Sequence, residues 1–384
     1  MNRTIFTCIS FALCAAAIGQ TGSAQSSDDS IDNSSSPAAY IYVSRPTHVD
    51  GFAAASNGKL TAVSGSPFAN IAISHMSVTK KFLFGAGDDS QTLFTYSIAS
   101  NGSLKQVASL DAQAYNSSNC GGMGPITIDQ TGSTLYNIVN NDCDDLIQAY
   151  KIESNGSLKY VGSTDSGIGT DLFVVGPLTF LGSNNYAYQW GCGGDSFPAG
   201  GLIQYKRQSN GILVAESYPT LPSPENTNDI YCPEAIASDP SDHMAVAAME
   251  YDEYFDQIPP SLLVDYTTSS NGTLTTKSTY KNMPETGFDY VGTMSISPSG
   301  KLLAVGGQGF EIFHFNGSSQ ATKFSGVLQA GSSFQQFAWD KSNHLYALTE
   351  NALYVYTVTT TSIEQAPGSP YSIPEASSVI VLSL

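Results

Sequence analysis

Two side chains in this 384-residue chain could take part in acid–base chemistry. His75 lies in the segment ISHMSVT, and an imidazole can serve as a general base near neutral pH. Glu234 lies two residues after Cys232, and its carboxylate could activate water beside His75 if the fold brings the two together. A structural role is the alternative for each: a hydrogen-bonded channel-lining residue for His75, and a solvated carboxylate at a loop end for Glu234.

The signatures of several common enzyme classes are missing from the chain. It contains no H-E-x-x-H, no G-x-S-x-G and no glycine-rich phosphate loop. The histidines other than His75 show no spacing typical of metal ligands. A catalytic function can therefore be predicted from the sequence only if His75 and Glu234 act together.

Acidic residues gather in two segments, NNDCDD (140–145) and MEYDEYFDQIPP (249–260). Their carboxylates are hard oxygen ligands that could bind calcium as a cofactor: Asp142, Asp144 and Asp145, or Asp252, Glu253 and Asp256. Neither segment has the D-x-[DN]-x-[DN]-G order, so a solvated acidic rim is the alternative. Four aromatic residues could stack on a sugar or a peptide, or could simply pack within their loops: Tyr231, Tyr251, Tyr254 and Phe255.

A repeated phrase indicates the elements that position these residues. YSIASNGSLKQV (96–107) recurs almost unchanged as YKIESNGSLKYV (150–161), and looser copies appear at 51–63, 205–215, 266–276 and 314–324. An Asn-Gly pair between alternating apolar and polar residues predicts a strand, a tight turn and a second strand. Four strands per unit of roughly 40 to 60 residues are typical of a β-propeller blade.

The two ends of the repeat predict how many blades the ring has. The first copy, at residue 38, has no inner strand before it, and SSVIVLSL (377–384) forms an inner-type strand with nothing after it. Six complete units and one split unit predict an all-β, seven-bladed propeller of four-stranded antiparallel blades. The C-terminal strand pairs with N-terminal strands from 38–68 and so closes the ring.

The phrases YIYVS, GFAAASNGKLTAVSGSPF, ISPSGKLLAV and APGSPYSI resemble the seven-bladed lactonase-like (YVTN or 6-phosphogluconolactonase-type) propellers. The resemblance covers residues 38–384. It implies this fold and an activity on lactones that uses His, Glu and Arg near the central channel. This chain has only Arg45 and Arg207 after residue 24, and the family's frequent Pro-Arg-His appears as Ser74-His75. Hydrolysis of a phosphorylated sugar lactone is therefore not expected.

The N-terminus and the net charge predict an exported protein. One basic residue, an apolar run and small residues near Ala24 indicate a signal peptide over 1–24, followed by a flexible polar tether over 25–37 and the propeller over 38–384. Without Arg3 the chain has 14 basic and 33 acidic residues, a net charge of −19. This charge argues against nucleic acid and anionic membranes as partners. We expect a secreted or periplasmic monomer that does not insert into a membrane.

Four cysteines remain after residue 24, which suggests two disulfides in an exported protein. The order of strands and loops in the propeller predicts the pairs Cys120–Cys143 and Cys192–Cys232. A four-thiolate zinc site is the alternative, although the chain lacks a C-x-x-C pair.

Two functions remain from different classes. One is a scaffold that binds a small molecule, a glycan or a protein through the acidic, aromatic face that carries the long loops. The other is a hydrolase of a neutral lactone or ester at the channel mouth. Whether the chain is an enzyme at all stays open at this point.

Overall fold

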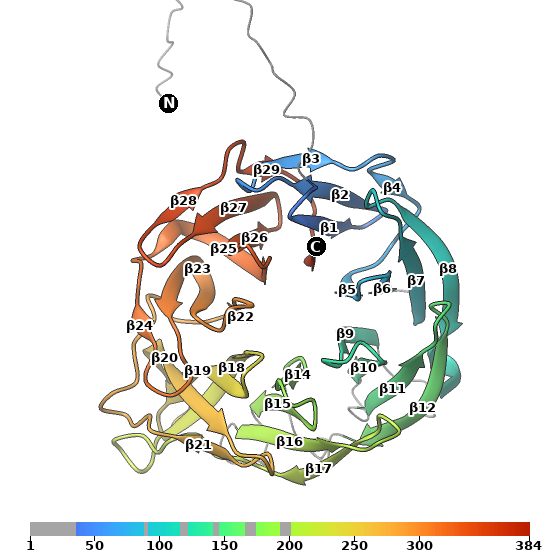
Figure 1. Ribbon diagram of the computed structural model, residues 1–384. Coiled ribbons are helices and arrows are strands. Elements are labelled where there is room, and N and C mark those ends of the chain that lie inside the picture. Colours follow the sequence, from blue (N-terminus) through green and yellow to red (C-terminus); the bar gives the residue numbers. More distant parts are fainter. Residues whose placement is uncertain (1–35, 88–90, 116–121, 141–145, 166–173, 193–200) are drawn as a thin grey trace, which may run out of the picture. The chain divides into compact units, whose positions relative to one another are not determined.

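The computed structural model describes residues 36–87, 91–115, 122–140, 146–165, 174–192 and 201–384. Within these ranges the chain is built from β-strands, with one short 3-10 turn, η1 (Gln113–Tyr115). The strands form six hydrogen-bonded sheets, and the largest of them contains two blades joined through one long strand. The described residues thus make seven blades arranged in a ring (Figure 1).

The first three blades, from the inner strand outward, are regular. Blade 1 contains β30 (Ser378–Ser383), β1 (Ala39–Arg45), β2 (His48–Ala54) and β3 (Leu60–Ala62), with β4 (Phe68–Ala69) beside β2. Blade 2 contains β5 (His75–Val78), β6 (Phe82–Ala86), β7 (Thr92–Ile98) and β8 (Leu104–Asp111). Blade 3 contains β9 (Gly122–Ile128), β10 (Thr134–Asn140), β11 (Leu146–Ile152) and β12 (Leu158–Asp165).

Blades 4 and 5 follow the same order. Blade 4 has a divided inner strand, β13 (Val174–Val175) and β14 (Thr179–Phe180), followed by β15 (Tyr186–Cys192), β16 (Gly201–Arg207) and β17 (Leu213–Ser217). Blade 5 contains β18 (Ile230–Ser238), β19 (His243–Tyr251), β20 (Gln257–Thr268) and β21 (Leu274–Thr276).

Blades 6 and 7 share a strand. Blade 6 contains β22 (Thr293–Ile296), β23 (Leu302–His314) and β24 (Thr322–Lys323). β23 folds back on itself and so supplies both middle strands of blade 6. A hydrogen bond from Phe315 N to Lys301 O joins the residues that flank its two ends. β25 (Leu328–Trp339) pairs with β23 through its first half and with β26 (His344–Thr349) of blade 7 through its second half. Blade 7 ends with β27 (Ala352–Val358), β28 (Ile363–Gln365) and β29 (Tyr371–Ser372).

The ring closes as the sequence predicts. β30 pairs antiparallel with β1 in the register Ala39↔Ser383 to Ser44↔Ser378, so the C-terminal strand becomes the inner strand of the N-terminal blade. The Ser44 and Ser378 hydroxyl oxygens lie 2.8 Å apart at one end of this pairing. The predicted seven-bladed fold with split closure is confirmed.

The repeated Asn-Gly turn holds neighbouring blades together. Gly102 and Gly211 have positive φ angles of 81° and 95°, which favour glycine. Their carbonyl oxygens accept hydrogen bonds from tyrosines of the preceding blade: Tyr42 Oη donates to Gly102 O at 2.8 Å, and Tyr136 Oη donates to Gly211 O at 2.6 Å. A turn that must both bend tightly and dock on the sheet of the preceding blade explains why the phrase recurs.

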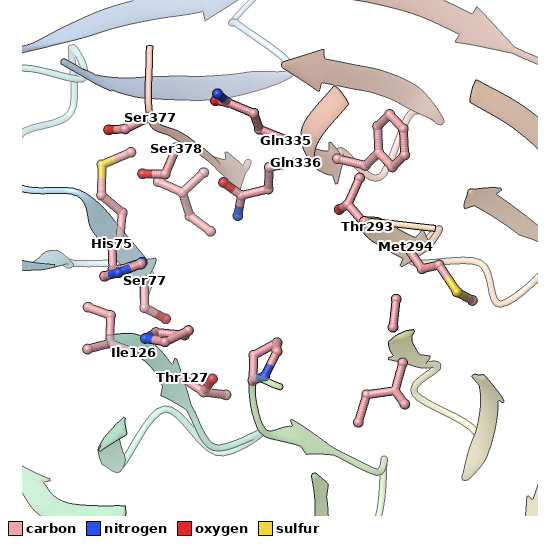
Figure 2. Close-up of a pocket in the computed structure, with 18 of the residues that line it drawn as sticks. His75, Ser77, Ile126, Thr127, Thr293, Met294, Gln335, Gln336, Ser377 and Ser378 are labelled. Carbon is pink, nitrogen blue, oxygen red and sulfur yellow. The ribbon is translucent and has the colours of Figure 1, made fainter. Parts of the chain in front are cut away.

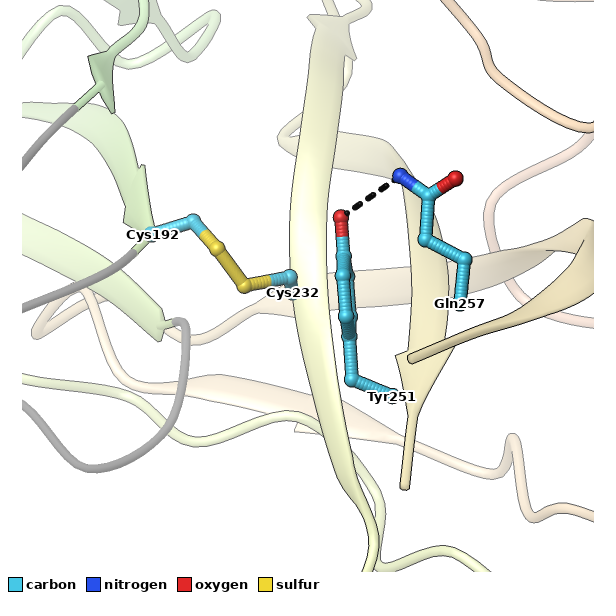
Figure 3. Close-up of a disulfide and its surroundings, with 4 residues drawn as sticks. All are labelled: Cys192, Cys232, Tyr251 and Gln257. Atoms are coloured by element: carbon cyan, nitrogen blue, oxygen red, sulfur yellow. Dashed lines mark hydrogen bonds between the residues drawn. A yellow bond between two sulfur atoms is a disulfide. The ribbon is translucent and has the colours of Figure 1, made fainter. Parts of the chain in front are cut away.

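A disulfide joins blades 4 and 5. Cys192, the last residue of β15, is bonded to Cys232 of β18 with a Cα–Cα distance of 5.4 Å (Figure 3). This confirms one predicted pair and places Cys232 within the inner strand of blade 5. Cys120 and Cys143 lie outside the described residues. Among the described residues we find no helix that is long and apolar enough to cross a membrane.

Candidate functional site

The inner strands of six blades, together with Pro177 and Trp190 of blade 4, contribute to a central cavity of about 510 Å³. Figure 2 shows side chains from blades 1, 2, 3, 6 and 7 around it, several with hydroxyl or amide groups. The polar lining residues on these blades include Ser77, Thr127, Thr293, Gln335, Gln336, Ser377 and Ser378. No Lys or Arg is among the described residues that line it, and its ionisable residues are His75 and Glu234. This lining suits a neutral ligand better than an anionic one.

The two arginines after residue 24 are held by carboxylates away from this cavity. Arg207 Nη2 lies 2.6 Å from Asp129 Oδ2, and the Asp129 side chain is fully buried. Arg45 Nη1 lies 3.7 Å from Asp50 Oδ2. Neither arginine is a lining residue of the cavity.

Glu234 lies at an irregularity in β18. The register of β18 against β19 shifts between Pro233 and Ala235, so Glu234 occupies a β-bulge, a feature that re-aims a side chain. Its side chain turns toward blade 6: Oε2 accepts hydrogen bonds from Ser261 Oγ at 2.6 Å and from Val291 N at 3.1 Å. Glu234 therefore lies inside a strand, and the expected solvated carboxylate at a loop end is wrong.

The second carboxyl oxygen of Glu234 makes this residue the strongest candidate for chemistry. The residue is 6% exposed, and no described group hydrogen-bonds to Oε1. Burial raises the pKa of Glu234 to about 7, and the hydrogen bonds from Ser261 and Val291 lower it by less. A buried carboxyl with an unpartnered oxygen and a pKa near neutrality is typical of functional sites.

His75 is the first residue of β5, is half-buried and lines the same cavity (Figure 2). It belongs to blade 2, however, and Glu234 belongs to blade 5, three blades further around the seven-blade ring. The two residues thus line opposite sides of the cavity. The predicted arrangement, in which Glu234 activates water alongside His75, does not fit these positions.

Trp190 is a site residue that the sequence analysis missed. It lies on β15 of blade 4, lines the cavity and is 7% exposed, and no described group accepts a hydrogen bond from its Nε1. Gly176 packs so closely that a Cβ there would lie 1.8 Å from Nε1. The only sequence signal was a tryptophan on a strand beside the Cys192 loop. The cavity thus has a buried hydrogen-bond donor and a buried acceptor on neighbouring blades.

The long-loop face of blade 5 carries the aromatic residues. We use "long-loop face" for the face that holds the loops between second and third strands and the linkers between blades. Tyr254 and Phe255 are 76% and 71% exposed at the tip of the loop between β19 and β20. Asp252 Oδ1 holds this turn by accepting hydrogen bonds from the backbone N–H groups of Tyr254 (2.8 Å) and Asp256 (2.9 Å). Phe255 keeps a positive φ of 64°, so the turn presents this ring at a cost in backbone strain.

The other predicted aromatic residues have different surroundings. Tyr231 is 3% exposed and packs in the core between blades 4 and 5, so its ring cannot be part of the binding surface. Tyr251 is half-buried, and its hydroxyl accepts a hydrogen bond from Gln257 Nε2 at 3.0 Å (Figure 3). Tyr290, which the sequence analysis missed, is 56% exposed in the linker to blade 6. Burial raises the pKa of Tyr290, and the charges of Glu234 and Tyr251 raise it further. The next residue, Val291, donates its backbone hydrogen bond to Glu234 Oε2 at 3.1 Å, so the linker passes beside Glu234.

Those of the predicted calcium ligands that the structure describes do not form a metal-binding group. Among the described residues no three His, Cys, Asp or Glu side chains come together in a way that could hold a metal ion. Asp252 instead caps its own turn, and Glu253 Oε2 accepts a long hydrogen bond, 3.5 Å, from Asn228 Nδ2. Asp142, Asp144 and Asp145 lie outside the described residues.

The raised pKa of Glu234 predicts how stability depends on pH. Because the folded state favours the neutral acid, this contribution to stability is fully present below pH 4.5 and is lost as the pH rises through about 7. We expect the difference in unfolding free energy between the wild type and Glu234→Gln to change by roughly 3 kcal/mol between these limits, in favour of the variant at high pH. Urea denaturation at several pH values measures it. Glu364→Gln on the exposed strand β28 is the control, and parallel curves for wild type and Glu234→Gln would contradict the assignment.

Comparisons with known proteins agree with the architecture. No protein-family model and no curated protein sequence matches the chain. Among solved structures, the periplasmic gluconolactonase of Pseudomonas aeruginosa is 14% identical over 90% of this chain and 99% of its own, with a TM-score of 0.66. A protein from Lactobacillus plantarum is 12% identical over 90% and 100% of the two chains, also with a TM-score of 0.66.

Hydrazine synthase of Kuenenia stuttgartiensis also matches, with 14% identity, coverage of 89% and 100% of the two chains, and a TM-score of 0.58. One scaffold therefore appears in proteins with unrelated names. At these identities the likeness shows the fold, a β-propeller, and function must be argued from the site.

Proposed function

We propose that this protein is an exported propeller that binds a ligand or partner through its long-loop face, at the mouth of the channel where blades 5 and 6 meet. The observation that carries the proposal is the presentation of Tyr254 and Phe255 to solvent on a turn fixed by Asp252. Exposed aromatic side chains on a loop of a rigid scaffold are typical of binding surfaces. Tyr290 is exposed in the linker that passes beside Glu234, and Gly292 of the same linker lines the cavity.

We propose that the protein is secreted or periplasmic. Residues 1–24 then serve as a signal peptide, 25–37 as a tether and 38–384 as the binding domain, which acts as a monomer. The Cys192–Cys232 bond supports an oxidising compartment, because disulfides persist there and are rare in the cytosol. The net charge of −18 disfavours nucleic acids and anionic membranes as partners.

A ligand panel tests the proposed face. Small molecules, glycans and peptides are screened for binding to the wild type, to Tyr254→Ala/Phe255→Ala and to Tyr280→Ala. Tyr280 is 37% exposed, and the ammonium of Lys281 already lies over its ring at 5.2 Å, so it serves as the matched control. We expect affinity to fall about tenfold in the double variant and to stay unchanged in the control. Ligands that bind all three proteins equally would place the binding site elsewhere.

A second candidate function is hydrolysis of a neutral lactone or ester in the same channel mouth. The observation that favours it is Glu234, whose buried, unpartnered carboxyl oxygen and raised pKa suit a general base. The panel therefore includes neutral lactones, with turnover measured for the wild type, Glu234→Gln and His75→Ala. A general base predicts a loss of about 100-fold in kcat/KM for its variant. A loss in Glu234→Gln supports hydrolysis, and the absence of any turnover leaves binding as the function.

A further inference from the structure

Blade 5 is rich in carboxyl groups and poor in basic residues. Between residues 208 and 276, which run from the outer part of blade 4 through blade 5, the chain has no Lys and no Arg. The acidic residues of this stretch are Glu216, Glu225, Asp229, Glu234, Asp239, Asp242, Glu250, Asp252, Glu253, Asp256 and Asp265. Lys206 Nζ lies 3.4 Å from Glu216 Oε1, and His243 Nδ1 lies 2.8 Å from Asp239 Oδ2. A Lys or Arg that balances the other carboxylates has to come from outside the stretch.

Three of these carboxyl groups lie close together beside the aromatic turn. Asp229 is 9% exposed and accepts a hydrogen bond from Asn226 Nδ2 at 2.8 Å. Burial raises the pKa of Glu250, and a hydrogen bond with Tyr231 lowers it. The charge of Asp229, a hydrogen bond with Asp229 and the charge of Glu225 raise this pKa further, so the negative charges of Asp229 and Glu225 repel an ionised Glu250. The hydrogen bond from Asn228 Nδ2 to Glu253 Oε2 ties this cluster to the turn that carries Tyr254. A cation brought to this place would relieve the repulsion.

The exposed rings of the same turn have no cation over them. The described contacts between a cation and an aromatic ring are Lys281 over Tyr280 at 5.2 Å and Lys323 over Phe313 at 5.8 Å, both away from the turn. Tyr254 and Phe255 present open faces beside carboxylates. Aromatic faces flanked by acidic groups attract Lys and Arg side chains, because the negative ring face and the carboxylates act in the same direction.

We infer that the long-loop face of blade 5 binds a basic segment of a partner protein, with Lys or Arg side chains lying over Tyr254 and Phe255 and beside Glu253 and Asp256. This inference rests on the proposed function and names the partner class for the same face. The surface is open and spread over a loop and a linker, which suits an extended peptide. A neutral glycan would gain nothing from the excess of carboxyl groups, and an anionic one would be repelled.

The test uses the mature protein and a short labelled peptide in which Lys or Arg alternates with Gly, with binding followed by fluorescence anisotropy. The control peptide has Glu in place of each basic residue. We expect binding of the basic peptide only, and a marked loss of affinity when salt is raised from about 0.05 M to about 0.5 M. Tyr254→Ala/Phe255→Ala should weaken binding by roughly five- to thirtyfold, the sum of two exposed cation–aromatic contacts. Glu253→Gln/Asp256→Asn should weaken it and flatten the salt dependence, and Tyr280→Ala should leave it unchanged.

The outcomes separate this inference from the function on which it rests. Equal binding of both peptides, or no binding of the basic peptide, overturns the inference. If a neutral glycan from the panel binds and loses affinity in Tyr254→Ala/Phe255→Ala, the proposed face stands and the partner class is wrong. If the double variant binds every ligand as the wild type does, the proposed face is wrong as well.

Discussion

Removal of residues 377–384 is expected to abolish the cooperative unfolding transition. This deletion takes away β30, the inner strand of blade 1, whose Val379 and Leu382 are 0% and 7% exposed. It also removes the hydrogen bond from Val379 N to Gln336 Oε1 (2.8 Å), which links blade 1 to blade 7. Each lost buried aliphatic side chain costs about 2 to 5 kcal/mol, and a whole domain is stable by about 5 to 15 kcal/mol. The deletion therefore removes most of the stability.

Thermal unfolding followed by circular dichroism, together with size-exclusion chromatography, measures this effect. The matched control ends the chain at Ser383 and removes only Leu384, which is 56% exposed. We expect the control to unfold like the wild type and the longer deletion to aggregate, because the inner edge of β1 would be left unpaired. A deletion mutant that melts at the wild-type temperature would show that β30 does not close the ring.

Loss of the Cys192–Cys232 bond is expected to destabilise the fold by about 4 kcal/mol. The bond spans 40 residues of sequence, and a cross-link over a loop of that length lowers the entropy of the unfolded chain by this amount. Cys192→Ala/Cys232→Ala is the variant, because alanine suits the buried position of Cys232. Chemical denaturation of wild type and variant measures the effect.

A single variant, Cys192→Ala, provides the control for this bond. Both variants break the same cross-link, so we expect them to lose nearly equal stability. The result that would contradict the bond is a stability unchanged in both variants, or a free thiol on Cys192 or Cys232 in the oxidised wild-type protein.

The fold could be predicted from the sequence because each repeat unit contains the strand and turn pattern of one blade. The Asn-Gly turns fix strand ends, and alternating apolar residues fix which strand faces fill the space between blades. The split unit at residues 38 and 377–384 then determines the number of blades and the closure. Even the disulfide between Cys192 and Cys232 follows from this order, since it places the two cysteines on neighbouring blades.

The site could be predicted only in part, because side-chain direction depends on local irregularities. The bulge at Glu234 turns the carboxyl group of this residue toward Ser261 and Val291. No feature of the sequence YCPEAIA indicates a bulge. Tyr231 was expected at the surface but lies on the buried side of β18. Trp190 and Tyr290 were missed because their importance comes from neighbours that lie far from them in the sequence.

The most direct test of the proposed face is hydrogen exchange measured by mass spectrometry, with and without each binding member of the ligand panel. The account predicts slower exchange in residues 251–260 and 286–294, the loop of Tyr254 and the linker of Tyr290. Slower exchange confined to the Asn-Gly turns at 99–103, 153–157 and 208–212, or no member of the panel that protects either predicted segment, would contradict it.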